Sequence, residues 1–133
     1  YMGTDRFGMP WISGGGCLTS RDFLRFGLLF SRKGLGVKNR IVGSSSFIDK
    51  TLKNSGTKYM ELSKNKFLHY SNSTMRCGDW IGHSGLAGQF LAINLKTKLV
   101  ACFFSVIDTD SGTDEDYKRQ MINMMDEIVN KDY

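Results

Sequence analysis

The chain has 133 residues, 41% of them hydrophobic and 23% charged, and a formal net charge of +5. This size and composition predict one globular domain, residues 1–133, and exclude a disordered tail. The longest apolar run, residues 99–106, is far shorter than the roughly 20 residues of a membrane span, and residues 1–5 show no signal-peptide pattern. Acids interrupt the lysines and arginines, and no aromatics interleave them. We therefore expect a solvated basic surface and no nucleic-acid site.

The cysteines indicate neither a metal site nor a disulfide framework. Cys17, Cys77 and Cys102 are odd in number and show no CxxC or CxxH spacing. Cys102 lies inside an apolar run and is predicted to be a small core residue. The sequence therefore calls for no metal and no cofactor, and it is compatible with either the bacterial periplasm or the cytoplasm.

The first predicted helix follows a turn-rich segment. Residues 3–16 are rich in glycine and contain the only proline, which favours a loop. Thr19 or Ser20 can cap the helix that follows, and Asp22 suits the positive end of its dipole. Apolar side chains recur at helical spacing over residues 20–31, namely Phe23, Leu24, Phe26, Leu28 and Phe30.

A second, shorter helix is expected after the serine cluster at residues 44–46. Ile48 and Leu52 then lie one helical turn apart on the same side. Residues 54–79 are polar, with only brief apolar pieces and no clear period. We therefore expect strands only after Gly78.

The pattern after Gly78 is typical of strands. Residues 89–95 alternate, which predicts two faces: Leu91, Ile93 and Leu95 on one, Phe90 and Ala92 on the other. Residues 94–98 supply a tight connection. The nearly continuous apolar run at residues 99–107 predicts a strand buried on both faces.

The chain is expected to close with an amphipathic helix. Thr113 is the predicted cap, and residues 114–116 load the first turn with acids. Its apolar stripe is predicted to be Tyr117, Met121, Met124 and Ile128, with Met125 beside it. The whole pattern predicts an α+β fold, with an antiparallel sheet and packed helices that include a C-terminal one.

The candidate functional segment is residues 82–89, GHSGLAGQ. A polar pair flanked by glycines packs poorly inside a strand but lets a ligand approach the backbone N–H groups. A glycine-rich β-bulge is the structural alternative for the same residues.

Four segments together resemble the C-terminal part of class C β-lactamase-like and penicillin-binding-protein-like serine hydrolases, a family that includes esterases, peptidases and 6-aminohexanoate-dimer hydrolases. Residues 14–27 (GGGCLTSRDFLRFG) are similar to the family's GG…xxRDLARFG segment. The others are residues 4–10 (TDRFGMP), residues 39–42 (NRIV), and residues 80–85 (WIGHSG), which are similar to the third motif, K/H-T/S-G.

The resemblance implies the C-terminal portion of a β-lactamase/transpeptidase-like fold and acyl transfer to a serine. His83, Ser84 and Gly85 would occupy the third motif, and the backbone N–H of Leu86 would donate to the oxyanion. Gly85 would leave room for a small-molecule or peptide-like substrate along the strand. His83 replaces the lysine of true β-lactamases, which favours an amide or ester hydrolase.

The resemblance places the S-x-x-K and Y-x-N motifs in an N-terminal part outside this chain. Three strings inside the chain match by letter: residues 55–58, residues 63–66 and residues 70–72. They lie in a polar, helix-poor stretch, so we expect chance matches and no nucleophile in this chain alone. The alternative is a catalytically inactive module that binds peptidoglycan-like or peptide ligands.

Three charged residues of the RDFLRFG segment also need an interpretation. Arg21, Asp22 and Arg25 are expected to pair at the helix end and to take no part in catalysis.

Overall fold

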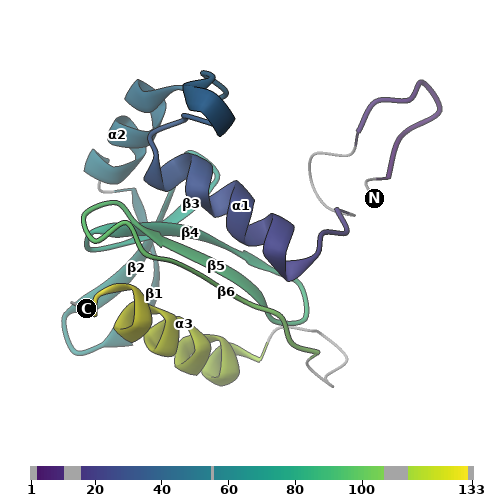
Figure 1. Ribbon diagram of the computed structural model, residues 1–133. Helices are drawn as coiled ribbons and strands as arrows, with labels where there is room; N and C mark the ends of the chain where they lie inside the picture. The colour runs from purple at the N-terminus through teal and green to yellow at the C-terminus, as the bar shows by residue number, and fades with distance from the viewer. Residues whose placement is uncertain (1–2, 11–15, 55, 107–113, 132–133) are drawn as a thin grey trace.

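A six-stranded antiparallel sheet forms the centre of the protein, with helices on both of its faces (Figure 1). The structure is a computed structural model, and it describes residues 3–10, 16–54, 56–106 and 114–131. The elements in chain order are α1 (Ser20–Ser31), η1 (Val37–Asn39), α2 (Ser45–Lys53), β1 (Thr57–Ser63), β2 (Lys66–Ser71), β3 (Thr74–Cys77), β4 (Trp80–Gly85), β5 (Gln89–Asn94), β6 (Val100–Phe103) and α3 (Glu115–Val129). The predicted α+β class with a C-terminal helix is confirmed.

The sheet is a meander in which each strand pairs with the next, in the order β1-β2-β3-β4-β5-β6. Tight turns join the strands, and residues in the left-handed region occupy them, such as Asn65, Asn72, Ser73 and Ala87. The strands over residues 57–77 were not predicted from the sequence. Their core-facing side chains, such as Met60 with Leu62 and Met75 with Cys77, alternate over only two positions in each strand. Cross-strand pairing therefore defines these strands more than an apolar period does.

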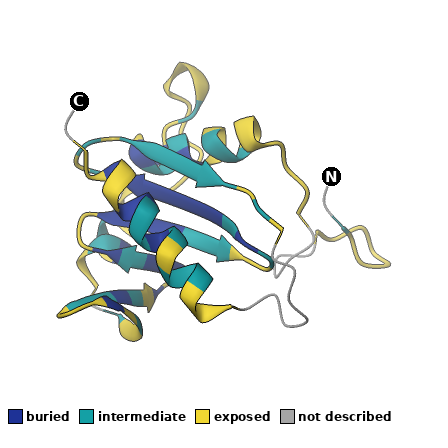
Figure 2. Cartoon of the chain, turned by 90° about the horizontal axis from the view of Figure 1, so that it is seen from below, coloured by how far each residue is buried: buried dark blue, intermediate teal, exposed yellow. Residues whose placement is uncertain are grey.

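The two faces of the sheet carry separate cores. α1 and α2 cover one face, where Ile48, Ile81, Leu91 and Ile93 are buried. α3 covers the other face, over a larger cluster: Leu62, Leu68, Met75, Cys77, Trp80, Phe90, Ala92, Ile122, Met125 and Val129. The alternation predicted for residues 89–95 is therefore confirmed. Figure 2 shows the central strands as the most buried part of the chain.

The first two helices begin where their capping residues predict. The Thr19 Oγ1 of α1 accepts a hydrogen bond from the Asp22 N–H at 3.1 Å, and Ser44 caps α2 by accepting from Phe47 N–H. The Asp22 carboxylate accepts from the Thr19 hydroxyl and from Arg25, and these two bonds lower the pKa of Asp22 below its ordinary value. This end of α1 thus has the expected cap and pairs Asp22 with Arg25, whereas Arg21 has no carboxylate partner among the described residues.

The last strand corrects the sequence prediction. β6 has four residues at the edge of the sheet, and all four are only partly buried. Val106 is 90% exposed, and Ile107 lies outside the described residues. β6 does pack on both faces, with Ala101 and Phe103 against the α3-side core and Val100 and Cys102 against the α1-side core. It is shorter than the predicted run and only partly buried, and no further strand covers its outer edge in the described part of the chain.

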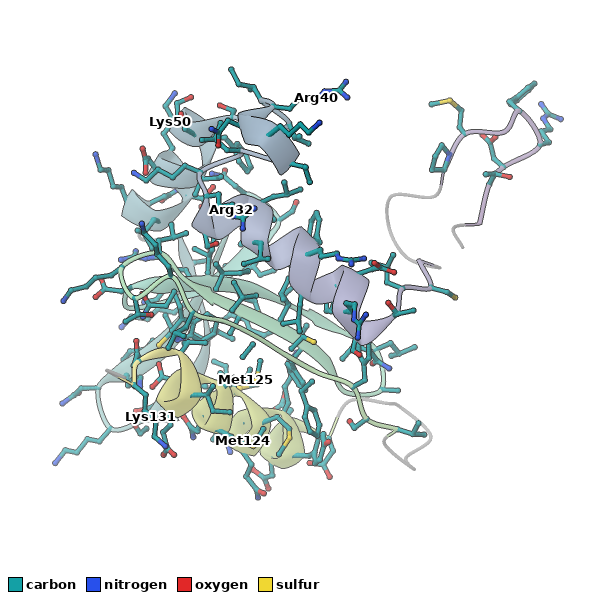
Figure 3. The ribbon with its side chains drawn as sticks, viewed as in Figure 1. Arg32, Arg40, Lys50, Met124, Met125 and Lys131 are labelled. Atoms are coloured by element: carbon teal, nitrogen blue, oxygen red, sulfur yellow. The ribbon has the colours of Figure 1, made fainter. Side chains whose placement is uncertain are left out.

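The last helix is also rotated relative to the prediction. Its cap is Asp114, whose carboxylate accepts from the Tyr117 N–H at 2.9 Å, and Thr113 lies outside the described residues. The most buried residues of α3 are Ile122, Met125, Asp126 and Val129. The predicted Tyr117, Met121 and Met124 are partly buried against the same core, whereas Ile128 is 38% exposed. Met125 projects from α3 toward the sheet (Figure 3). None of the helices in the described part of the chain is long and apolar enough to cross a membrane.

The two cysteines of the sheet are thiols within packed surroundings. Cys77 is buried, and desolvation raises the pKa of its thiol to about 11, so it remains protonated at neutral pH. Cys102 is partly buried against the α1 side, with its sulfur 3.6 Å from the Ser20 carbonyl oxygen. This position agrees with the prediction that Cys102 is a small residue packed against the core.

Asp126 explains the rotation of α3. Its buried carboxylate accepts a hydrogen bond from Trp80 Nε1 at 2.8 Å and forms an ion pair with Lys66. Trp80 begins β4 and Lys66 begins β2, so one side chain of α3 holds two strands. A buried carboxylate requires such donors, since an unpaired one is costly to desolvate. This requirement turns Asp126 toward the sheet.

Replacing Asp126 with alanine should lower the free energy of unfolding by about 2 to 4 kcal/mol, because the Trp80 N–H would be buried without an acceptor. Urea denaturation followed by tryptophan fluorescence measures the change. The matched control is Asp116→Ala, which removes an exposed α3 pair with Arg119 and should cost no more than about 0.5 kcal/mol. Equal losses in the two variants would contradict this role of Asp126.

Candidate functional site

The candidate segment lies at the end of β4 and in the turn that follows. The pleat of the strand sends its two polar side chains to opposite faces of the sheet. The His83 ring packs edge-on to Phe30 of α1, with the ring centroids 6.3 Å apart. Ser84 lines a cavity on the α3 side, together with Met75 and Phe90. The structure therefore brings Ser84, Gly85 and Leu86 to one cavity and leaves the His83 side chain outside it.

The end of β4 has an edge without a partner strand among the described residues. β3 pairs with β4 only as far as Gly82, opposite Met75, and the chain then turns at Asn72 and Ser73. β5 pairs with β4 through Gly85. Residues 83–85 are thus held in extended form by β5 on one side and leave their other edge open to an extended ligand.

A cavity of about 560 Å³ adjoins this edge. It lies between the β4–β5 turn, the beginning of β1 and the beginning of α3. Its walls combine apolar and polar groups: Thr57, Lys58, Tyr59, Tyr70, Met75, Ser84, Gly85, Leu86, Gly88, Phe90, Asp114 and Lys118. Its size suits a small molecule or a few residues of a peptide.

A hydrogen-bonded chain holds the turn beside the cavity. The Gly88 carbonyl oxygen accepts from the Ser105 N–H at 3.2 Å and from the Ser105 hydroxyl at 3.0 Å. The Tyr117 hydroxyl donates to Ser105 Oγ at 2.7 Å, which connects the turn to α3. Leu86 is 74% exposed, and these hydrogen bonds hold the backbone of the turn that carries it at a fixed place.

A lysine from α3 provides charge at the opposite wall. Lys118 Nζ donates to the Tyr59 hydroxyl at 2.8 Å, and its ammonium also lies 4.8 Å from the centre of the Tyr59 ring. Tyr70 lies beside Tyr59, with the ring centroids 6.1 Å apart. Lys58, although it lines the cavity, places its ammonium 4.0 Å from the centre of the Phe67 ring. This wall can thus donate hydrogen bonds to an anionic or carbonyl group.

The three letter matches to catalytic motifs are not assembled into one site among the described residues. The Lys66 ammonium pairs with Asp126, and the Asn72 amide donates to Thr51 Oγ1 of α2 at 3.0 Å. Tyr70 does line the cavity, which the sequence did not predict. Ser55, the serine of the first string, lies outside the described residues.

The functional residues that sequence reasoning missed come from distant segments. Lys118 and Tyr59 are 59 positions apart and meet only because α3 packs beside β1. Ser105 and Tyr117 belong to a loop and a helix with no motif of their own. No local signal in the sequence indicates these contacts.

The two glycines of β4 differ in how much room their surroundings leave for a side chain. A Cβ on Gly82 would lie 2.1 Å from the Leu91 carbonyl oxygen and 3.2 Å from the Trp80 ring. A Cβ on Gly85 would instead meet the side chain of Gln89, at 3.1 Å. Gly82 is therefore required by strand packing, while Gly85 is exposed at the end of β4 beside the cavity.

Gly82→Ala should lower the free energy of unfolding by about 1 to 3 kcal/mol, because backbone atoms must move to admit the methyl group. Gly85→Ala should cost less, since only the Gln89 side chain must shift. Thermal unfolding of the two variants measures the difference. A Gly85 variant as unstable as the Gly82 variant would show that both glycines serve packing.

Burial of the His83 ring lowers its pKa below the ordinary value, because desolvation disfavours the imidazolium. The folded state therefore prefers the neutral ring. As the pH falls below about 6.5, the unfolded chain binds a proton at this position before the folded chain does. The stability associated with a neutral His83 is thus present above that pH and is lost as the pH falls toward the folded-state pKa.

His83→Gln should flatten the dependence of the unfolding free energy on pH between about pH 7 and about pH 5. Urea denaturation at a series of pH values, on the variant and the natural sequence together, measures this slope. Parallel slopes in the two proteins would contradict a buried, neutral His83.

No protein-family model, curated protein or solved structure matches the chain. Within the described ranges, no three His, Cys, Asp or Glu side chains gather in a way that could hold a metal ion.

Proposed function

We propose that this chain forms the substrate-facing sheet of a serine hydrolase that cleaves an amide or ester bond through an acyl-enzyme. The observation that carries the proposal is the open edge of β4 at residues 83–85, beside the cavity that Ser84, Gly85 and Leu86 line. The third motif of the hydrolases that the sequence resembles falls on the same residues. The proposed fold is the C-terminal portion of the β-lactamase/transpeptidase-like fold.

In this proposal the substrate lies extended along the open edge of β4. A serine oxygen bonds to the substrate carbonyl carbon, and the leaving nitrogen or oxygen departs with a proton. Water then cleaves the acyl-enzyme and regenerates the serine. The Leu86 N–H donates to the carbonyl oxygen as negative charge develops on it, and the bonds that hold Gly88 keep this donor in place.

The proposal assigns the nucleophile to polypeptide outside this chain. His83 then serves from the α1 face, where its neutral imidazole can accept a proton or donate a hydrogen bond to a segment packed there. Ser84 positions the substrate from the α3 face, with Lys118 and Tyr59 across the cavity.

A binding module without catalysis is the second candidate, and one observation favours it. The residues of the three letter matches lie on both faces of the sheet among the described residues, since Lys66 pairs with Asp126 of α3 and Asn72 donates to Thr51 of α2. The open edge of β4 by itself suffices to bind an extended peptide. Both candidates use the same edge, so a binding experiment tests what they share.

Leu86→Pro should weaken the binding of an acylated D-alanyl-D-alanine peptide by about tenfold or more, because proline removes the N–H donor. Leu86→Ala is the matched control: it keeps the N–H, and because the residue is 74% exposed it should weaken binding much less than the proline does. Backbone amide shifts in NMR titrations measure the affinities. Equal binding by both variants would contradict the proposed use of this edge.

One further observation separates the candidates, and another tests what they share. The hydrolase predicts that the gene encodes S-x-x-K and then Y-x-N in frame before Tyr1, whereas the binding module predicts neither. Both predict that a fluorophosphonate does not label this chain alone. Stoichiometric labelling of a serine within the chain would overturn the assignment of the nucleophile to another segment.

A further inference from the structure

The net positive charge of the protein is concentrated in the layer formed by α1, η1 and α2. Residues 20–53 contain eight lysines and arginines against two aspartates, a net charge of +6, while the remaining residues carry ten basic and eleven acidic side chains, a net charge of −1. Both aspartates of the layer are already paired, Asp22 with Arg25 and Asp49 with Lys33. The other basic side chains have no carboxylate partner among the described residues: Arg21, Arg32, Lys38, Arg40, Lys50 and Lys53.

Large apolar side chains are exposed in the same layer. Val37 and Ile41 are each 80% exposed, and Val42 is 60% exposed. Phe26 and Phe47 are nearly half exposed beside a shallow apolar groove of about 230 Å³ between α1 and α2. Exposed aliphatic groups that cluster in this way mark an interaction surface more often than a solvated one.

The exposed Val37 and Ile41 lie in the connection between α1 and α2, which backbone hydrogen bonds hold in place. The Gly34 carbonyl oxygen accepts from the Val42 N–H at 2.9 Å and from the Gly43 N–H at 3.1 Å, and Gly36 N–H donates to the Arg40 carbonyl oxygen at 2.8 Å. The connection therefore projects as a tight hairpin beyond the helices, at the end of the layer that Figure 1 shows away from α3. Arg40 and Lys50 point outward at this end (Figure 3).

We propose that this hairpin and the basic residues around it form a peripheral binding surface for an anionic lipid bilayer. Val37 and Ile41 would enter the boundary between headgroups and acyl chains, while Lys38 and Arg40 contact anionic headgroups. A nucleic acid would satisfy the basic residues but would gain nothing from exposed Val37 and Ile41. A bilayer matches both kinds of group, and the proposal does not depend on the proposed hydrolase function.

The test is flotation of the whole chain with vesicles of phosphatidylcholine alone and of equal parts phosphatidylcholine and phosphatidylglycerol. The chain should bind the anionic vesicles and should dissociate as salt is raised, because screening weakens the charge contribution. Binding that is equal for both vesicle types, or absent from both, would overturn the proposal.

Variants of the hairpin test each part of the surface. Lys38→Gln with Arg40→Gln should weaken binding to anionic vesicles by about 30-fold, or about fivefold for each charge lost near the surface. Val37→Ser with Ile41→Ser should weaken it by about tenfold or more, because the apolar insertion is lost. Circular dichroism melts establish that the variants fold.

The matched control removes the same charge elsewhere. Lys96→Gln with Lys98→Gln changes two exposed residues of the β5–β6 turn, and it should leave vesicle binding within about twofold. If this control weakens binding as much as the hairpin variant does, net charge alone drives binding and the surface is not specific. If an RNA or DNA oligonucleotide displaces the chain from vesicles and binds the Val37 and Ile41 variant unchanged, the basic layer is a nucleic-acid surface and the lipid proposal is wrong.

Discussion

The buried carboxylate of Asp126 is the interaction on which the arrangement of α3 depends. It accepts from Trp80 at the start of β4 and pairs with Lys66 at the start of β2, so one helix side chain joins two strands. A carboxylate in this position must have donors, and the observed rotation of α3 supplies them. That rotation buries Ile122, Met125 and Val129 and leaves Ile128 at the surface.

The same rotation builds the cavity beside the open edge of β4. It directs Lys118 to Tyr59 and Tyr117 to Ser105, and Ser105 in turn holds the Gly88 carbonyl oxygen. The candidate site is therefore not a property of the GHSG segment alone. It requires the β4–β5 turn, the loop after β6 and the first turns of α3 to meet, and the carboxylate at the far end of the helix secures that meeting.

The two faces of the sheet differ in charge as well as in packing. The α1–α2 layer holds more than the whole net charge of the chain, with exposed aliphatic groups at its outer end, whereas α3 begins with two acids after its Asp114 cap. The cavity opens on the α3 side, and the basic hairpin lies on the other side. The proposed ligand site and the proposed membrane surface thus lie on opposite faces and would not compete.

The sequence by itself determined the elements whose signals are local. Thr19 and Ser44 cap α1 and α2 as predicted, and the two faces of β5 follow from strict alternation, because capping and side-chain direction depend on neighbours within a few residues. Only the tertiary structure decided the pairing of β1 to β3, the edge position of β6 and the placement of His83 and Ser84 on opposite faces. These features rest on contacts between residues far apart in the chain, such as Lys118 with Tyr59 and Asp126 with Lys66, which no local period records.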